Sequence, residues 1–240
     1  MTMGVIHRDA IQSDVFSLDR CSGVLFDLDG TLVDSAPDLL AAVNAVLADA
    51  GRTPLELATL RPVVSKGARA MLMLAFADDD AAQREARIPS MLAYYAKAIA
   101  RHTRPFVGIE SLLARIEGAG KRWGIVTNKS AVLARTVVAA MGWSERCGVL
   151  VGGDTLPVSK PDPAPLLHAC MQVRIDPSRC VYVGDDERDI QAARAAVMPS
   201  TAALWGYRAA DDDAHAWGAD IVIAHPDELF AAVDTDHGRD

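Results

Sequence analysis

Short apolar runs rich in β-branched residues alternate with helical patterns along most of the chain after residue 20, and this alternation restricts the possible folds most strongly. The runs are continuous rather than alternating in polarity, as expected for strands covered on both faces. Strands that alternate with helices predict an α/β fold with a doubly wound parallel sheet. The expected strands are GVLFD (23–27), WGIVTN (123–128), GVLVGG (148–153), CVYVGD (180–185), TAALWG (201–206) and DIVIA (220–224).

A stretch with only helical patterns interrupts this alternation after the first expected strand. Alanine and leucine dominate residues 36–104, and no convincing strand pattern lies among them. Pro37 fits the first turn of the opening helix, and Gly51 fits its end. We therefore expect a core domain formed by residues 20–35 and 105–240, with a helical cap domain, residues 36–104, inserted after the first strand.

The composition limits the partners that this chain can bind. The formal net charge is −8 at pH 7, and the sequence pI is about 5.2. A phosphate backbone needs a basic face, so we expect no nucleic-acid partner. A small phosphorylated metabolite needs only a local basic site or a metal ion, and it stays compatible with this charge. Hydrophobic residues make up 50% of the chain, which is enough for a sizeable core.

No segment has the pattern of a membrane span or an export signal. No apolar stretch reaches the length of a transmembrane helix, and the polar N-terminus lacks the apolar centre of a signal peptide. We expect residues 1–19 to be a loosely ordered extension, and the protein to be cytoplasmic without a membrane partner. The sequence is compatible with a monomer and with a homodimer. The cysteines lack zinc-site spacing, and we expect reduced thiols. They are Cys21, Cys147, Cys170 and Cys180.

Two carboxylates follow the first expected strand directly. Asp27 and Asp29 lie one residue apart, and Gly30 and Thr31 come next. Residues i and i+2 of an extended segment share a face, so both carboxylates would face the crevice where parallel sheets bind ligands. Carboxylates so close together resist burial unless their charge is offset, and a divalent cation is the usual partner. A solvated turn is the alternative for D-x-D alone, but D-x-D-G-T after a β-rich run is rare by chance.

Three further polar groups follow later strands. Thr127 and Asn128 close WGIVTN, where a hydroxyl could bind a phosphoryl oxygen or could simply cap a helix. Lys160, in SKPDP, could neutralise charge that develops on a phosphoryl group, although an isolated lysine is more often a surface residue. Asp185 and Asp189, in VGDDERD, are four residues apart and would stack on one helix face. A carboxylate here could instead cap that helix.

In their order and their common position after strands, these motifs resemble those of the haloacid dehalogenase superfamily. D-x-D-G-T, a strand ending in threonine, a lysine before a proline-rich turn, and G-D-x-x-x-D occur in family order. The resemblance covers residues 23 to about 225, and the helical insert matches the family's helical cap domain. The resemblance implies a magnesium-dependent enzyme on a Rossmann-like core.

The resemblance also implies a role for each motif residue. Asp27 would be the nucleophile that forms an aspartyl-phosphate, and Asp29 would be the general acid and base. Thr127 and Lys160 would hold the phosphoryl oxygens. Mg²⁺ would be bound by Asp27, Asp185 and the backbone carbonyl of Asp29, with Asp189 supporting this group from behind.

An aspartate at position 29 favours phosphomonoester hydrolysis or phosphoryl mutase chemistry within this superfamily. Further stretches are similar to the phosphoglycolate phosphatase group, and more closely to its N-acetylmuramic acid 6-phosphate phosphatase branch. The implied enzyme is a phosphoric monoester hydrolase of carbohydrate metabolism that acts on a small phosphorylated metabolite. A mutase of the β-phosphoglucomutase type and a catalytically silent binding protein are the alternatives. The similar stretches are SKGARAMLMLAF, WGIVTNK, VGDDERDI and WGADIVIAHPDEL.

The cap is expected to select the substrate. We predict that its loop from Ser65 to Arg69 reaches the site, and that Lys66, Arg69 and Asn128 contact the substrate. Lys66 stands where the similar branch has a small residue, and it would meet an anionic or hydroxyl-rich part of the substrate; a solvated lysine at a helix start is the alternative. Val197 stands where the family has a glycine at the end of a helix, and we expect it to strain that turn.

Overall fold

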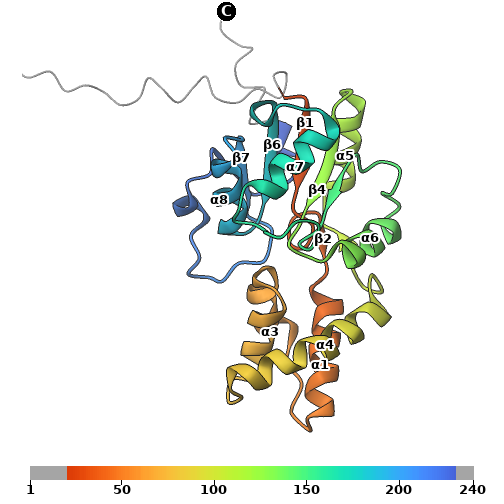
Figure 1. The fold of residues 1–240 in the computed structure, drawn as a ribbon, viewed down its shortest axis with the longest axis vertical. Helices are drawn as coiled ribbons and strands as arrows, with labels where there is room; N and C mark the ends of the chain where they lie inside the picture. The colour runs from red at the N-terminus through yellow and green to blue at the C-terminus, as the bar shows by residue number, and fades with distance from the viewer. Residues whose placement is uncertain (1–20, 231–240) are drawn as a thin grey trace, which may run out of the picture.

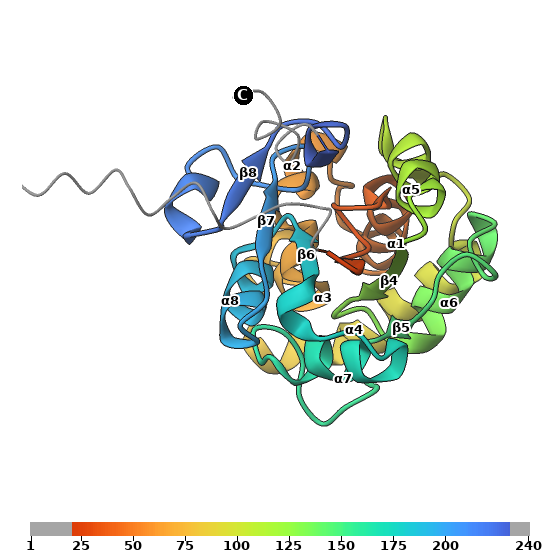
Figure 2. The same cartoon turned by 90° about the horizontal axis from the view of Figure 1, so that it is seen from above.

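Six parallel strands form the centre of the computed structural model, which describes residues 21–230 (Figure 1). Their order across the sheet is β5-β4-β1-β6-β7-β8, seen from above in Figure 2. Each of the six expected strands is present, and the prediction of a doubly wound parallel sheet is confirmed. The expected N-terminal extension lies outside the described residues. The strands are β1 (Gly23–Phe26), β4 (Arg122–Val126), β5 (Leu150–Val151), β6 (Cys180–Gly184), β7 (Ser200–Ala203) and β8 (Ile221–Ile223).

The first strand lies at the point where the strand order reverses. β1 pairs in parallel with β4 on one side and with β6 on the other, and all four of its residues are buried. The chain builds the sheet outward from β1 in both directions, and such a reversal opens a crevice at the carboxyl ends of the strands. The residues that follow β1 therefore lie where this kind of sheet binds ligands.

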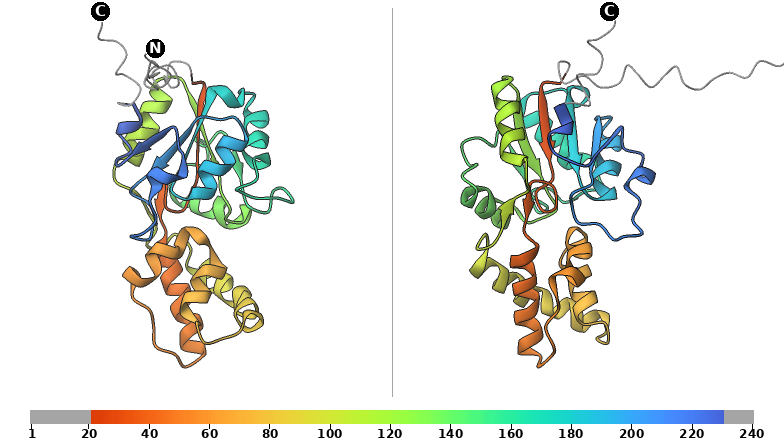
Figure 3. Two further views of the ribbon diagram at one scale, coloured as in Figure 1. Left: turned by 90° about the vertical axis from the view of Figure 1, so that its left-hand side faces the viewer. Right: turned by 180° about the vertical axis from the view of Figure 1, so that it is seen from behind.

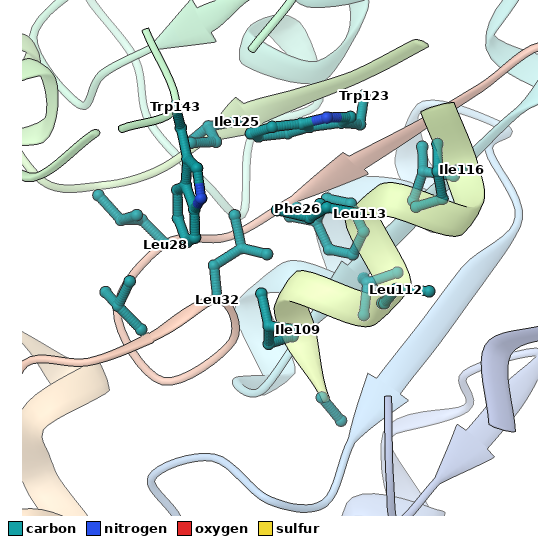
Figure 4. Packing of buried hydrophobic residues seen from close by; sticks show 14 of the residues in the cluster. Phe26, Leu28, Leu32, Ile109, Leu112, Leu113, Ile116, Trp123, Ile125 and Trp143 are labelled. Carbon is teal, nitrogen blue, oxygen red and sulfur yellow. The ribbon is translucent and has the colours of Figure 1, made fainter. Parts of the chain in front are cut away.

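Two helices cover each face of the sheet. Successive side chains of a strand point to opposite faces, so Val24 and Phe26 pack with α5 and α6, whereas Leu25 packs with α7 and α8. Figure 4 shows the first of these clusters, in which Leu113 of α5 lies against Phe26. The helices are α5 (Ile109–Gly118), α6 (Ala131–Ala140), α7 (Ala164–Val173) and α8 (Glu187–Ala195).

A group of helices, which we call the helical unit, lies beyond the carboxyl ends of the central strands (Figures 1 and 3). It has its own hydrophobic cluster, which includes Leu72, Phe76 and Tyr95. The antiparallel pair β2 (Val33–Asp34) and β3 (Arg104–Pro105) joins it to the sheet. The division of the chain into core and cap domains stays a prediction. The unit consists of α1 (Ala36–Asp49), α2 (Leu57–Leu60), the 3₁₀ helix η2 (Arg61–Lys66), α3 (Ala68–Ala75) and α4 (Ala81–Ala98).

Two short 3₁₀ helices lie near the later strands, η3 (Pro177–Arg179) and η4 (Ala214–Trp217). Within residues 21–230, no helix combines the length and the apolar character that crossing a membrane requires. All four cysteines are free thiols.

The end of α8 carries the residue that replaces the family's glycine. Val197 has a φ of +54°, in the left-handed region. Its N–H donates to the carbonyl of Arg194 (3.1 Å), and the N–H of Met198 donates to the carbonyl of Ala193 (2.9 Å). This pair of bonds forms a Schellman motif, which ordinarily ends in glycine. A β-branched residue is strained at this φ, which is the effect predicted from the sequence.

We expect Val197→Gly to raise the free energy of unfolding by about 1 kcal/mol. Glycine removes the energetic penalty of roughly 1–2 kcal/mol that a non-glycine residue has at a left-handed φ. Part of this gain is lost, because glycine also raises the conformational entropy of the unfolded chain. Little packing is lost, because Val197 is 79% exposed. The denaturation midpoint should rise without a change in slope. Val197→Ala keeps a Cβ and serves as the matched control, with a smaller effect expected. A lower midpoint for Val197→Gly would contradict the strain.

Candidate active site

A cavity of about 330 Å³ lies between the carboxyl ends of the central strands and the helical unit. Its charged side chains come from the core, and its apolar side chains come mostly from the helical unit. The cavity therefore has a polar floor and an apolar roof. The predicted site residues that line it are Asp27, Asp29, Thr127, Asn128, Lys160 and Asp189.

Lys160 holds two of the predicted carboxylates at the cavity floor. Its Nζ lies 3.0 Å from Asp27 Oδ1 and 2.7 Å from Asp189 Oδ1, and it donates to the hydroxyl of Tyr182 at 2.7 Å. Burial opposes the charged form of Lys160, but Asp189 and Asp27 together outweigh burial and raise its pKa. Lys160 is therefore a buried cation fixed against the carboxylate that follows β1.

Asp185 accepts hydrogen bonds from three directions. Thr31 Oγ1 donates to it at 2.9 Å, Ser65 Oγ at 2.8 Å and the N–H of Tyr207 at 2.9 Å. Burial raises its pKa well above the usual range, and the charges of Asp27 and Asp189 add to this effect. Among the described residues, no basic side chain forms an ion pair with it.

The glycine of D-x-D-G-T is required by both its backbone and its surroundings. Gly30 has a φ of +91°, and a Cβ there would lie 2.2 Å from Asp185 Oδ2. Thr31 follows and donates to the same carboxylate. The D-x-D-G-T motif after β1 therefore lies directly against Asp185 at the end of β6.

Three carboxylates form a group with the chemistry of a magnesium site. Oxygen atoms of Asp27, Asp185 and Asp189 all lie within 4.8 Å of one another. Lys160 offsets one of these three negative charges, and hard divalent cations prefer oxygen ligands. The residues therefore fit Mg²⁺.

Two members of this group, Asp27 and Asp185, are predicted metal ligands, and Asp189 is the residue predicted to support them. The carboxylate of Asp29 is not in the group, and the predicted ligation of the metal by the backbone carbonyl of Asp29 stays a prediction. Asp27 and Asp29 both line the cavity at the carboxyl end of β1, as predicted. The carboxyl group of Asp189 also accepts from the N–H of Asp186 at 3.1 Å, which fixes it at the start of α8.

Asp29 is bound by a lysine that the sequence reasoning missed. Lys129 Nζ lies 3.0 Å from Asp29 Oδ1 and 2.8 Å from Asp29 Oδ2, and Ser35 Oγ also donates to Oδ1. Burial opposes the charged form of Lys129, but Asp29 and Tyr95 outweigh burial and raise its pKa. The same Nζ lies 4.5 Å from the ring centroid of Tyr95 in α4. The two aspartates of the motif therefore have separate lysine partners.

Thr127 and Asn128 both lie at the cavity, but their side chains differ in what they contact. Thr127 is buried, and its hydroxyl accepts from the N–H of Lys129 at 3.2 Å. The Asn128 amide accepts from the N–H of Lys160 and donates to its carbonyl, both at 3.0 Å. In this arrangement Asn128 fixes the backbone of Lys160, and its predicted substrate contact stays a prediction.

The segment from Ser65 to Arg69, which covers the end of η2 and the start of α3, reaches the core as expected. Ser65 and Gly67 line the cavity, whereas Lys66 and Arg69 do not. Lys66 Nζ instead lies 2.9 Å from Asp186 Oδ2, and the guanidinium of Arg69 is exposed and paired with Glu85 at 2.6 Å. Lys66 therefore joins the helical unit to the core, because a core carboxylate stands opposite it.

A second missed residue strengthens this connection. Arg188 Nε donates to Asp186 Oδ1 at 2.8 Å, and its Nη2 donates to the backbone carbonyl of Ser65. Asp186 therefore has a cation on each side, from α8 and from the helical unit. Nothing in the local sequence marks Arg188, since its partner Ser65 lies far away in the chain.

A family model described as haloacid dehalogenase-like hydrolase matches residues 24–203. The chain belongs to the haloacid dehalogenase-like hydrolase family. This match spans the helical unit and all of the sheet strands except β8, and it includes every predicted site residue. The predictions of family and of an enzyme of phosphoglycolate phosphatase-like type are confirmed.

Relatives of this hydrolase carry two phosphatase names. A phosphoglycolate phosphatase of Xanthomonas campestris pv. campestris (strain 8004) is 56% identical over 207 residues, which are 86% of this chain and 94% of the relative. An N-acetylmuramic acid 6-phosphate phosphatase of Pseudomonas aeruginosa is 44% identical over 216 residues, which are 90% of this chain and 96% of the relative.

Solved structures of the family have the same fold. The crystal structure of a predicted phosphoglycolate phosphatase from Haemophilus somnus 129PT superposes with a TM-score of 0.79 at 23% identity. The superposition covers 89% of this chain and 98% of that chain. At this identity the likeness concerns the fold alone.

Proposed function

We propose that this hydrolase is a magnesium-dependent phosphomonoesterase that acts on a small phosphorylated metabolite through a phosphorylated Asp27. The single observation that carries the proposal is the pairing at the cavity floor, where Asp27 and Asp29 have different lysine partners. A nucleophile needs a nearby positive charge that attracts the phosphoryl group, and Lys160 supplies this charge beside Asp27. The residue that acts as acid and base must reach the leaving oxygen. Asp29 is available for this role because its carboxylate is not part of the group formed by Asp27, Asp185 and Asp189.

The reaction has two steps. A carboxylate oxygen of Asp27 attacks phosphorus, the bond to the ester oxygen breaks, and Asp29 donates a proton to the leaving alkoxide. Asp29 then takes a proton from a water molecule, which attacks the same phosphorus. The bond to Asp27 breaks, and inorganic phosphate leaves. Lys160 and the hydroxyl of Thr127 would bind phosphoryl oxygens, and Lys129 would hold Asp29 in place.

Asp27, Asp185 and the backbone carbonyl of Asp29 would hold Mg²⁺, with Asp189 beside them. When bound, Mg²⁺ supplies charge that offsets the carboxylates and the phosphoryl oxygens. The relatives support phosphoglycolate and N-acetylmuramic acid 6-phosphate as the first substrates to test.

The proposal is tested by measuring free phosphate from p-nitrophenyl phosphate, phosphoglycolate and N-acetylmuramic acid 6-phosphate, with Mg²⁺ and with excess EDTA. We expect turnover with Mg²⁺ and a loss of roughly 100-fold or more with EDTA, restored by adding Mg²⁺ back. A sugar phosphate that is isomerised without phosphate release would favour a mutase instead. No phosphate from any of the three would contradict the proposal.

A further inference from the structure

The apolar roof of the cavity has no role in the proposed reaction. Every charged side chain at the cavity comes from the core. The helical unit contributes instead a set of flexible or branched apolar side chains above them. These are Leu39, Val64, Met71, Met91 and Leu92. Phosphoryl transfer needs no apolar surface, so this roof faces some other part of the ligand.

One polar group stands within that apolar roof with a hydroxyl proton that no described residue accepts. Tyr95 lines the cavity and is 1% exposed, and its hydroxyl donates to no described residue, although the ammonium of Lys129 lies close enough to interact with it. Its neighbour Tyr94 is different, because that hydroxyl donates to Asp49 at 2.8 Å on the outer side of α4. Buried hydroxyls are nearly always hydrogen-bonded, so one at a cavity wall whose proton has no acceptor calls for a ligand.

The hydroxyl of Tyr95 is suited to donate. Burial raises the pKa of Tyr95 to about 12, so the proton stays in place at neutral pH. Lys129 faces the ring of Tyr95, 4.5 Å from its centroid, and two N–H groups of Lys129 are directed at Asp29. A ligand above Asp29 would therefore meet Tyr95 first, with a buried positive charge close by.

The size of the cavity also favours a ligand that extends well beyond the phosphate. Cavities of roughly 300–1,000 Å³ are typical of sites that enclose drug-sized ligands, and this one holds about 330 Å³. In phosphoglycolate, the part beyond the phosphate is only a carboxymethyl group. Such a small acid would leave most of the apolar roof without contacts.

We infer that Tyr95 and the apolar side chains around it form a subsite for the body of a phosphomonoester larger than phosphoglycolate, one that carries apolar substituents beside a hydrogen-bond acceptor. The inference rests on the proposed function and adds a substrate class to it. N-acetylmuramic acid 6-phosphate has such a body, with methyl groups next to amide and carboxylate oxygens. The hydroxyl of Tyr95 donates to one of these oxygens, and the roof covers the methyl groups.

The test compares two substrates in matched variants. Tyr95→Phe removes only the hydroxyl, and Tyr94→Phe makes the same change on the outer side of the same helix. We expect Tyr95→Phe to lower the ratio of kcat/KM for N-acetylmuramic acid 6-phosphate to that for phosphoglycolate by about ten-fold, as for one lost hydrogen bond. Tyr94→Phe should leave this ratio unchanged.

A second variant fills the subsite without touching a polar group. Ala68 lines the cavity at the first position of α3, and leucine is a good helix former. Ala68→Leu should therefore exclude the larger body, and we expect the same ratio to fall by at least ten-fold. The melting temperature of each variant serves to confirm that it is folded.

The outcomes separate the inference from the proposed function. Wild-type protein that releases phosphate from p-nitrophenyl phosphate but shows no preference for the larger substrate would overturn the subsite alone. An unchanged ratio of kcat/KM for the two substrates in both Tyr95→Phe and Ala68→Leu would also overturn the subsite alone. Wild-type protein that releases phosphate from none of these compounds would overturn the proposed function, and the inference with it.

Discussion

Replacing Asp27 with asparagine is expected to lower phosphate release by at least about a thousand-fold with every substrate. The amide of asparagine is not a nucleophile, so the first step has no attacking group. The fold should survive, because Asp27 adds to the repulsion on the buried carboxylates of Asp185 and Asp189. We therefore expect a melting temperature equal to or above that of the wild type. The measurements are a phosphate assay and thermal unfolding of the same preparations.

The control for this variant is Asp78→Asn, which makes the same chemical change at an exposed position in the helical unit. It should leave both activity and melting temperature unchanged. Substantial activity in Asp27→Asn would remove the assignment of Asp27 as the nucleophile. A folded and inactive Asp27→Asn beside an active control would agree with it.

Replacing Lys129 with methionine is expected to impair the proton transfer rather than the attack on phosphorus. Lys129 contacts both carboxylate oxygens of Asp29 and is itself buried, so its loss leaves that carboxylate free to turn. An alkyl phosphate needs a proton on its leaving oxygen, whereas p-nitrophenolate leaves without one. We expect the rate of the first step, followed as release of the alcohol or of p-nitrophenol within the first turnover, to fall by about 100-fold with an alkyl phosphate and by less than about ten-fold with p-nitrophenyl phosphate.

Two further variants decide between a positioning role and a general loss of structure. Lys97→Met removes an exposed lysine that lies 5.8 Å from the ring of Tyr94, and it should change neither rate. Lys129→Arg keeps the charge with a different shape, and it should restore part of the rate with the alkyl phosphate. An equal loss of the first-step rate with both substrates in Lys129→Met would mean that Lys129 does not act through Asp29.

The parts of the fold that sequence could predict are those set by local patterns. Continuous apolar runs indicated each strand of the six-stranded sheet, and parallel strands place their carboxyl ends at one edge of the sheet. This is why Asp27, Thr127, Lys160 and Asp185 could be expected near one another, although they lie far apart in the chain. The helical stretch after the first strand was equally clear, because its alanine and leucine pattern excludes strands.

The parts that sequence could not predict depend on pairs brought together by the fold. Lys129 follows a strand end, where a lysine is usually a surface residue, and its partner Asp29 lies 100 positions away. Lys66 was expected to meet the substrate because the loop that carries it approaches the site. Its actual partner, Asp186, depends on how the helical unit sits on the core.

The most direct test of the account is to find the phosphoryl group on the protein. Wild-type enzyme is mixed with an equimolar amount of phosphomonoester and Mg²⁺, quenched in acid within the first turnover, digested, and mapped by mass spectrometry. The account predicts one added phosphoryl group on the peptide that contains Asp27, with none in Asp27→Asn. A substrate consumed without any such adduct at any quench time, or an adduct on another residue, would contradict it.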